Sequence, residues 1–380
     1  MKKICIVTGS RSEYGLLRTT LFKIQESKKF KIQIIATGMH LSAEYGMTVQ
    51  EILDDGFIVD KRVETILSSD TAVGVVKSVG LGVISFAETL DELRPDLIMV
   101  LGDRYEILPA VVAALFLKVP IAHIHGGEST LGSIDDSIRH SISKMSHLHF
   151  VAAEEYRNKL IAMGESKSRI HVVGGLGLDA IYEEELIQKK DLEKIYKIKF
   201  ADKNLLITYH PSTLEDEEYP GKNFLQLLMA LKQFKGINFY FTSPNADEGS
   251  RKLIEMLDDF QRKNKNVYVF KSIGHKAYLS FIQYVDGVVG NSSSGLIEVP
   301  SFKKGTVNIG KRQFGRLEAS SVINCNPNCD EIYDAILNLY KPTFLKKLKN
   351  TINPYGAGGA GVKIVNTLIN TDFSKLLSKN

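Results

Sequence analysis

Apolar and polar positions follow two recurring patterns along the first half of the chain. Short, nearly continuous apolar runs are typical of buried parallel strands, and they read KICIV, KIQIIAT, DLIMVLGD, VPIAHIHGGE, HLHFVA and RIHVVG. Between them, apolar residues recur at helical spacing over 14–25, 49–53, 73–93, 107–117, 135–145 and 154–163. This alternation predicts a parallel sheet with helices on both faces.

The alternation stops and then restarts. Glycines crowd at 174–177, and the charged segment EEELIQKKDLEKIYK follows at 183–197. New strand-like runs are NLLITYHP, NFYFTSP, NVYVF, 285–289 and GTVNIG, separated by helical spacing at 224–234, at 248–260 and near Tyr278. The sequence therefore predicts an α/β chain with two Rossmann-like domains, 1–176 and 177–359. We expect a final helix within 360–380 to pack back on the first domain.

Chemically capable side chains gather where these predicted strands end. They are Arg11, His40, Asp103, His125 and Glu128 in the first half, and His210, Asn245 and Ser292 in the second. Open α/β sheets bind ligands beyond the carboxyl ends of their strands. We therefore expect the two edges to form a cleft between the domains.

The segment GNSSSGLIEVP, at 290–300, indicates a nucleotide-binding site. Asn291 and three serines follow a predicted strand, with Ser294 expected to cap a helix and Glu298 within its first turns. A helix N-terminus attracts a diphosphate, and an ionised carboxylate accepts both hydroxyls of a ribose. The alternative is an ordinary serine-rich helix cap.

Acids and histidines supply candidate chemistry in the first half. In LGDRYE, Arg104 either pairs with Asp103 or reaches a phosphate while Asp103 acts on substrate. In HIHGGE, strand alternation would place His123 and His125 on one face. A metal there lacks a clear third ligand, so acid–base work by His125 or Glu128 is favoured, with His123 buried and hydrogen-bonded.

Further charged residues have two interpretations each. Asp135 and Asp136 stand at a helix start, where they are either functional or dipole caps, and Arg139 is spaced to pair with Asp135. Arg11 and Arg312 either contact phosphates or are surface charges.

The composition and short motifs argue against several classes of function. The 380 residues are 44% hydrophobic and 24% charged, with a net charge of +4, which is too mild to indicate nucleic acid. Three cysteines are too few for a disulfide framework, and the pair in CNPNC has no second pair to complete a metal site. TGSRSEYG lacks the dinucleotide fingerprint, which disfavours NAD. No run is expected to span a membrane, and ICIV is too short for a signal peptide, so we expect a cytoplasmic protein.

A set of segments resembles one known family. In order along nearly the whole chain, TGSRSEYG, TGMHLSAEYG, LGDRYE, HIHGGE, DDSIRHSISKMSHLHF, YHP, SPNADEGS, GNSSSGLIEVPS and NIGKRQFGR are similar to segments of the hydrolysing UDP-N-acetylglucosamine 2-epimerases of bacterial sialic acid synthesis. The segment TGMHLSAEYG separates these from the non-hydrolysing epimerases.

The resemblance implies a GT-B-like pair of Rossmann-type domains with the active site in the interdomain cleft. It implies catalysis by Asp103 and Asp135, with either His125 or Glu128 at the position that is glutamate in relatives reading HIEGGE. The implied UDP and substrate contacts are Arg11, His40, Arg104, His210, Asn245, His275, Ser292, Ser293, Glu298 and Arg312. The resemblance implies no cofactor and no metal, and a homodimer or homotetramer.

The implied reaction converts UDP-N-acetylglucosamine and water to N-acetylmannosamine and UDP, by elimination to 2-acetamidoglucal and then hydration. An alternative within the family is the same chemistry on UDP-2,4-diacetamido-2,4,6-trideoxyglucose, in a legionaminic-type pathway. Outside it, the rivals are a GT-B glycosyltransferase with the same UDP seat and a UDP-sugar sensor that leaves its ligand intact.

Overall fold

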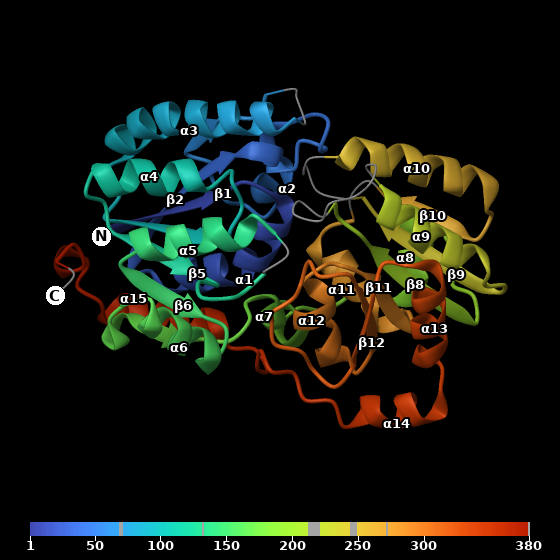
Figure 1. Cartoon of the computed structure of the whole chain (residues 1–380). Helices are drawn as coiled ribbons and strands as arrows, with labels where there is room; N and C mark the ends of the chain where they lie inside the picture. Colours follow the sequence, from blue (N-terminus) through green and yellow to red (C-terminus); the bar gives the residue numbers. More distant parts are fainter. Residues whose placement is uncertain (68–70, 131–132, 212–220, 244–248, 271–272, 379–380) are drawn as a thin grey trace. The chain divides into compact units, whose positions relative to one another are not determined.

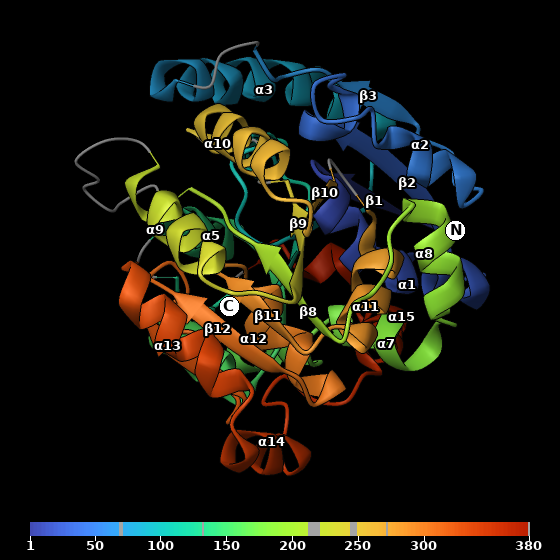
Figure 2. The ribbon, with the colours of Figure 1, turned by 90° about the vertical axis from the view of Figure 1, so that its right-hand side faces the viewer.

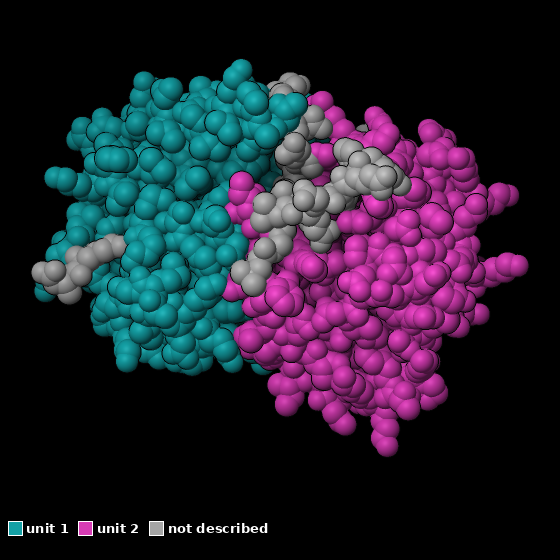
Figure 3. All heavy atoms as spheres, in the orientation of Figure 1, with its two compact units in different colours: residues 1–128, 135–182, 355–380 teal, residues 129–134, 183–354 magenta. Residues whose placement is uncertain are grey.

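The computed structural model describes residues 1–67, 71–130, 133–211, 221–243, 249–270 and 273–378. Its helices and strands are labelled along the chain in Figure 1. The chain divides into two compact units, coloured teal and magenta in Figure 3. Unit 1 contains 1–128, 135–182 and 355–380, and unit 2 contains 129–134 and 183–354. The expected boundaries at 176 and 359 thus lie six residues before and five residues after the nearest unit boundaries.

Unit 1 is built on a seven-stranded parallel sheet. Its strands are β1 (Lys2–Thr8), β2 (Phe30–Thr37), β3 (Lys61–Val63), β4 (Leu97–Leu101), β5 (Ile121–Ile124), β6 (Leu148–Val151) and β7 (Ile170–Val172). Their order is β3-β2-β1-β4-β5-β6-β7, and every pairing is parallel. The order reverses between β1 and β4, so the loops after these two strands flank a topological switch point.

Both faces of this sheet are buried, which explains its continuous apolar runs. Within β1, Ile4 and Ile6 join the core that contains α1 (Arg11–Ser27), α2 (Val49–Asp54) and α15 (Ala360–Asn370). The alternate residues Cys5 and Val7 join the core of α3 (Ala72–Leu93), α4 (Leu108–Phe116) and α5 (Asp135–Met145). Figure 1 shows α3, α4 and α5 stacked along one side. The helices α6 (Glu154–Ala162) and α7 (Gly177–Glu183) complete unit 1.

The last helix belongs to unit 1. Ile364 and Leu368 of α15 share a core with Leu17 and Leu21 of α1. The buried carboxylate of Asp179 accepts hydrogen bonds from the first two backbone N–H groups of α15, at 2.9 and 2.7 Å. A carboxylate at a helix start satisfies unpaired N–H groups and favours the helix dipole.

Unit 2 repeats the arrangement with six parallel strands. They are β8 (Lys203–Thr208), β9 (Ile237–Thr242), β10 (Val267–Phe270), β11 (Gly287–Gly290), β12 (Gly305–Ile309) and β13 (Val322–Cys325), in the order β10-β9-β8-β11-β12-β13. Its switch point lies between β8 and β11. In Figure 2, α9 (Lys222–Lys232) and α13 (Cys329–Leu339) lie on one side of this sheet and α8 (Lys189–Tyr196) and α11 (His275–Tyr284) on the other. The remaining helices are α10 (Ser250–Lys263), α12 (Ser294–Ile297) and α14 (Pro342–Lys349).

The α3 helix bears on the expectation that no run spans a membrane. It has 22 residues with a mean hydropathy of 1.5 over its most apolar stretch, so by length and composition it could cross a membrane. Only 28% of that stretch is buried. Several polar positions of α3 are serine or threonine, which lower the mean hydropathy of a helix less than charged residues do. Here α3 packs on α4, and Gly82 allows close contact because a Cβ there would lie 2.7 Å from Pro109.

Candidate functional site

Part of the predicted site in each unit lies at its switch point. In unit 1, the turn after β1 leads through Ser10 to Arg11, and the turn after β4 carries Asp103 and Arg104. In unit 2, His210 follows β8 and Asn291 follows β11. Ligands of open α/β sheets bind at such points, because adjacent loops diverge there and leave space.

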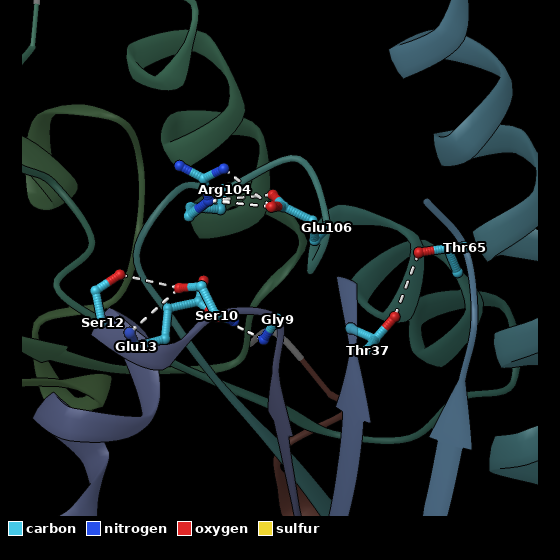
Figure 4. A network of polar contacts seen from close by, with 8 residues as sticks. All are labelled: Gly9, Ser10, Ser12, Glu13, Thr37, Thr65, Arg104 and Glu106. Carbon is cyan, nitrogen blue, oxygen red and sulfur yellow. Dashed lines mark hydrogen bonds and ion pairs between the residues drawn. The ribbon is translucent and has the colours of Figure 1, made fainter. Parts of the chain in front are cut away.

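A buried acidic pair supports the turn after β1. Ser10 caps α1: its hydroxyl accepts from the N–H of Glu13 at 3.3 Å, while Glu13 Oε2 accepts from the N–H groups of Gly9 and Ser10 at 2.6 and 3.2 Å. The Glu106 carboxylate is held by Arg104 Nη2 at 2.9 Å. Figure 4 shows this pair beside the turn. A Cβ on Gly9 would lie 2.9 Å from Glu106 Cβ, so glycine is required there.

These contacts change the protonation of Glu13. Burial, followed by the negative charge of Glu106, raises its pKa to about 8, against the opposing effect of the Gly9 N–H and Arg104. The native state therefore keeps a proton on Glu13 that the unfolded state releases between about pH 4.5 and 8. Under proton linkage, the contribution of Glu13 to the free energy of unfolding falls as pH rises through that range.

Glu13→Gln should remove this dependence, because glutamine keeps an acceptor for the cap but has no charge. Relative to the variant, which shares the opposing contributions of the buried His40 and His123, the wild-type free energy of unfolding should drop by a few kcal/mol between pH 5 and 8.5, at about 1.4 kcal/mol per unit of the raised Glu13 pKa. Urea unfolding across this pH range measures it. Glu26→Gln on the exposed face of α1 is the control and should keep the wild-type slope. Equal slopes for wild type and Glu13→Gln would contradict the assignment.

Arg11 and His40 occupy different environments. Arg11 is the first residue of α1, and its Nε lies 3.1 Å from Glu51 Oε1, with 16% of the arginine side chain exposed. His40 is fully buried, with its ring nitrogens 3.0 Å from Thr8 Oγ1 and 2.9 Å from Thr48 Oγ1. Burial lowers its pKa to about 4. Arg11 thus retains an exposed side, whereas the His40 ring holds the turn together instead of facing a ligand.

In LGDRYE, Arg104 and Asp103 each form an ion pair with a different residue from the one considered. Arg104 is paired with Glu106, and Asp103 forms an ion pair with Nη2 of Arg139 on α5. The expected pairing partner of Arg139 was Asp135, but its guanidinium instead reaches Asp103 and lies 3.9 Å from Asp136. The reason is that Arg139 turns inward from α5 and is 1% exposed. Sequence reasoning missed Arg139 and Glu106 as parts of this site.

HIHGGE does not continue as a strand to His125. The strand β5 ends at Ile124, and His125 has a left-handed backbone with φ +61°, so the expected alternation breaks. His125 Nε2 accepts from the N–H of Leu176 at 3.2 Å. Its Nδ1 lies 3.2 Å from Glu128 Oε1. His125 thus supports the buried Glu128 carboxylate.

His123 is a buried core residue, as expected. Its Nε2 lies 2.7 Å from the carbonyl oxygen of Gly102 and its Nδ1 lies 3.0 Å from Ser143 Oγ. Burial lowers its pKa to about 3, so the ring is neutral at physiological pH. Both ring nitrogens of His123 therefore make contacts inside the core of unit 1. Within the described ranges, no group of three or more His, Cys, Asp or Glu side chains is placed to hold a metal ion.

In unit 2, Asn291 joins the predicted nucleotide contacts. Its side chain accepts from the backbone N–H of His210 and donates to the backbone carbonyl of His210, both at 2.8 Å. Its own carbonyl accepts from Arg312 Nη1 at 3.3 Å and from Gln313 Nε2 at 2.9 Å. The segments YHP, GNSSS and KRQ therefore meet at one buried asparagine. The order of these motifs in sequence gives no sign of that contact.

The helix after β11 differs from the expected one. The first helical residue of α12 is Ser294 and its N-cap is Ser293, the helix has four residues, and Glu298 is its C-cap. A one-turn helix aligns few peptide dipoles, so the expected dipole attraction for a diphosphate is weak. Ser292 and Ser293 remain half-buried, and Glu298 is buried. Gly295 permits close packing, because a Cβ there would lie 2.6 Å from Thr306.

Three predicted site residues remain. His275 is the half-buried first residue of α11, after Gly274 with φ +75°. Asn245 lies outside the described residues. Asp135 begins α5 and is half-buried.

Comparison with known proteins identifies the family. Residues 22–369 match the family model described as UDP-N-acetylglucosamine 2-epimerase. The chain is 40% identical over 381 aligned positions to the GDP/UDP-N,N′-diacetylbacillosamine 2-epimerase (hydrolyzing) of Campylobacter jejuni, covering 100% of this chain and 98% of the relative. It is 36% identical to the polysialic acid biosynthesis protein P7 of Escherichia coli, covering 100% and 96%.

A solved structure matches the fold. The UDP-GlcNAc 2-epimerase from Neisseria meningitidis, bound to UDP-GlcNAc, has a TM-score of 0.81 at 19% identity, covering 97% of this chain and 100% of the other. This confirms the GT-B-like fold class with two Rossmann-type parallel sheets. The expected family resemblance is confirmed as well. The chain belongs to the UDP-N-acetylglucosamine 2-epimerase family and is of its hydrolysing type.

Proposed function

We propose that this protein releases UDP from a UDP-linked 2-acetamido sugar and inverts the configuration at C2 of that sugar. The observation that carries the proposal is the full-length match, at 40% identity, to a hydrolysing 2-epimerase. The acids at the unit 1 switch point and the His210–Asn291–Arg312 cluster in unit 2 support it, since the reaction needs acid–base groups and a diphosphate site.

The chemistry proceeds in two steps. A base removes the proton at C2 while the bond between C1 and the UDP oxygen breaks, which yields UDP and 2-acetamidoglucal. Water then adds at C1, and a proton returns to C2 on the opposite face. The C2 proton is weakly acidic, so cleavage at C1 must lead, and stabilising the departing diphosphate is the protein's largest task.

The proposed roles follow from the exposure of each group. Asp103 has 18% of its side chain exposed and can face the sugar, and Asp135 is half-buried. Glu128 is 1% exposed, with His125 against it, so we place this pair behind the reacting groups. The proposed UDP contacts that retain exposed surface are Arg11, Arg104, His275, Ser292, Ser293 and Arg312. His210 and Glu298 contribute from buried positions.

Two sugars are candidate substrates. The relatives at 40% and 34% identity are named as N,N′-diacetylbacillosamine 2-epimerases, which favours UDP-2,4-diacetamido-2,4,6-trideoxyglucose. The relative at 36% identity is a polysialic acid biosynthesis protein, which supports UDP-N-acetylglucosamine and a place in sialic acid synthesis. We propose the diacetamido sugar first and UDP-N-acetylglucosamine second.

A parallel assay tests both. Purified protein is incubated with each UDP-sugar, and with the GDP-linked diacetamido sugar, and the products are identified by NMR. We expect free nucleoside diphosphate and the free 2-epimeric sugar, with kcat/KM highest for one diacetamido substrate. A glycosyltransferase would leave all three intact without an acceptor, and a sensor would bind without turnover. Either of those results would overturn the proposal.

A further inference from the structure

Arg139 is the bulkiest of the fully buried side chains among the described residues. Burying a guanidinium is costly unless its charge and N–H groups are compensated. Here Nη2 pairs with the Asp103 carboxylate, and Nη1 donates to the backbone carbonyl of Glu128 at 3.1 Å. One side chain of α5 therefore connects LGDRYE to HIHGGE.

A second contact from the same helix reaches the same turn. Ser143 lies four residues after Arg139 and hence on the same face of α5. Its hydroxyl is 3.0 Å from His123 Nδ1, and His123 Nε2 is 2.7 Å from the carbonyl of Gly102. Because a carbonyl only accepts, His123 carries its hydrogen on Nε2, and Nδ1 accepts from Ser143. The backbone of the turn Gly102–Asp103 is thus held by His123, which Ser143 contacts from α5, and its Asp103 side chain is held by Arg139.

The two members of the Arg139–Asp103 pair differ in exposure. Arg139 is 1% exposed and Asp103 is 18% exposed, so the arginine holds the carboxylate from inside and leaves its outer side open. The nearby Asp136 on the same helix has its Oδ1 3.9 Å from Arg139 Nη1.

We propose that Arg139 is a positioning residue that holds the Asp103 carboxylate in the orientation needed for the proton transfer at C2, with Ser143 and His123 fixing the adjoining backbone. The inference rests on the proposed function and adds to it the element that orients its acid. A guanidinium presents a rigid fork of donors, which fixes a carboxylate more firmly than an ammonium does.

The test uses Arg139→Gln and Arg139→Lys in the full chain, with Arg157→Gln as the matched control. Arg157 lies on the neighbouring α6 and pairs with Glu154 at the surface, so its loss should change nothing. Arg139→Gln should lower kcat roughly 10–100-fold, with KM and UDP affinity by calorimetry within about threefold of wild type. Arg139→Lys should recover part of kcat, because the charge is kept.

A double variant separates positioning from simple structural support. If Arg139 acts through Asp103, then Asp103→Asn with Arg139→Gln should be no slower than Asp103→Asn alone, within about threefold. Losses that multiply would overturn the inference. If Arg139→Gln fails to fold, the inference is tested with Ser143→Ala and Arg139→Lys. A wild-type kcat in both of these variants would overturn the inference. If Arg139 variants keep wild-type kcat while Asp103→Asn is inactive, only this inference fails. If the wild type releases no UDP, the proposed function fails first.

Discussion

Asp103→Asn should reduce turnover by about 10²–10⁴-fold, the usual contribution of a general acid or base. Asparagine has the same shape but cannot accept the C2 proton, and it also leaves the buried Arg139 without its negative partner. Steady-state release of UDP measures the loss. We expect UDP to bind with nearly wild-type affinity by calorimetry, because the proposed diphosphate contacts are other residues.

The matched control is Asp259→Asn. Asp259 pairs with Lys263 on the exposed face of α10, and such surface pairs contribute little to stability. Its replacement should leave both turnover and the thermal midpoint unchanged. Full turnover by a folded Asp103→Asn variant would remove Asp103 from the reaction.

Gly290→Ala should abolish the stable fold of unit 2 or cost more than about 4 kcal/mol. Gly290 ends β11 with φ +145°, and it pairs in register with Thr208 of β8 and Asn308 of β12. A Cβ there would overlap the carbonyl oxygen of Thr208 and lie 2.7 Å from its carbonyl carbon. The clashing atoms belong to the backbone of β8, which cannot move aside as a flexible side chain could. The substitution should therefore be severely destabilising.

Gly80→Ala is the matched control for this variant. Gly80 is an exposed residue within α3, and a Cβ there would meet nothing within 4 Å. Alanine is the better helix former, so this change should stabilise the chain by roughly 0.5–1 kcal/mol. Urea unfolding compares the two variants. A Gly290→Ala protein with the wild-type midpoint and UDP affinity would contradict the packing described for β8 and β11.

The sequence predicted the strands whose side chains are buried on both faces of a sheet. The apolar runs of β1, β4 and β8 were identifiable because helices cover both faces of their sheets. The short edge strands β3 and β13 were missed, since Lys61 and Arg62 of β3 and Asn324 of β13 give no apolar run. The amphipathic helix α13 was also overlooked, although Ile332, Ala335 and Ile336 have the helical spacing of a buried face.

The candidate site could be predicted as a set of residues but not as a set of contacts. Asp103 and Glu128 stand after strands in sequence, and their place at a sheet edge follows from that. Arg139 has the ordinary spacing of a helix surface pair, and only the packing of α5 turns it inward to Asp103. Likewise, Asn291 reads as one polar residue among serines until the parallel pairing of β8 and β11 brings His210 beside it.

The central claim is that UDP leaves by elimination, with removal of the C2 proton and its later return from solvent. Running the reaction in heavy water tests it most directly. The account predicts one deuterium at C2 of the freed 2-epimeric sugar, and UDP as the other product. Free sugar that carries only protium at C2 would contradict it.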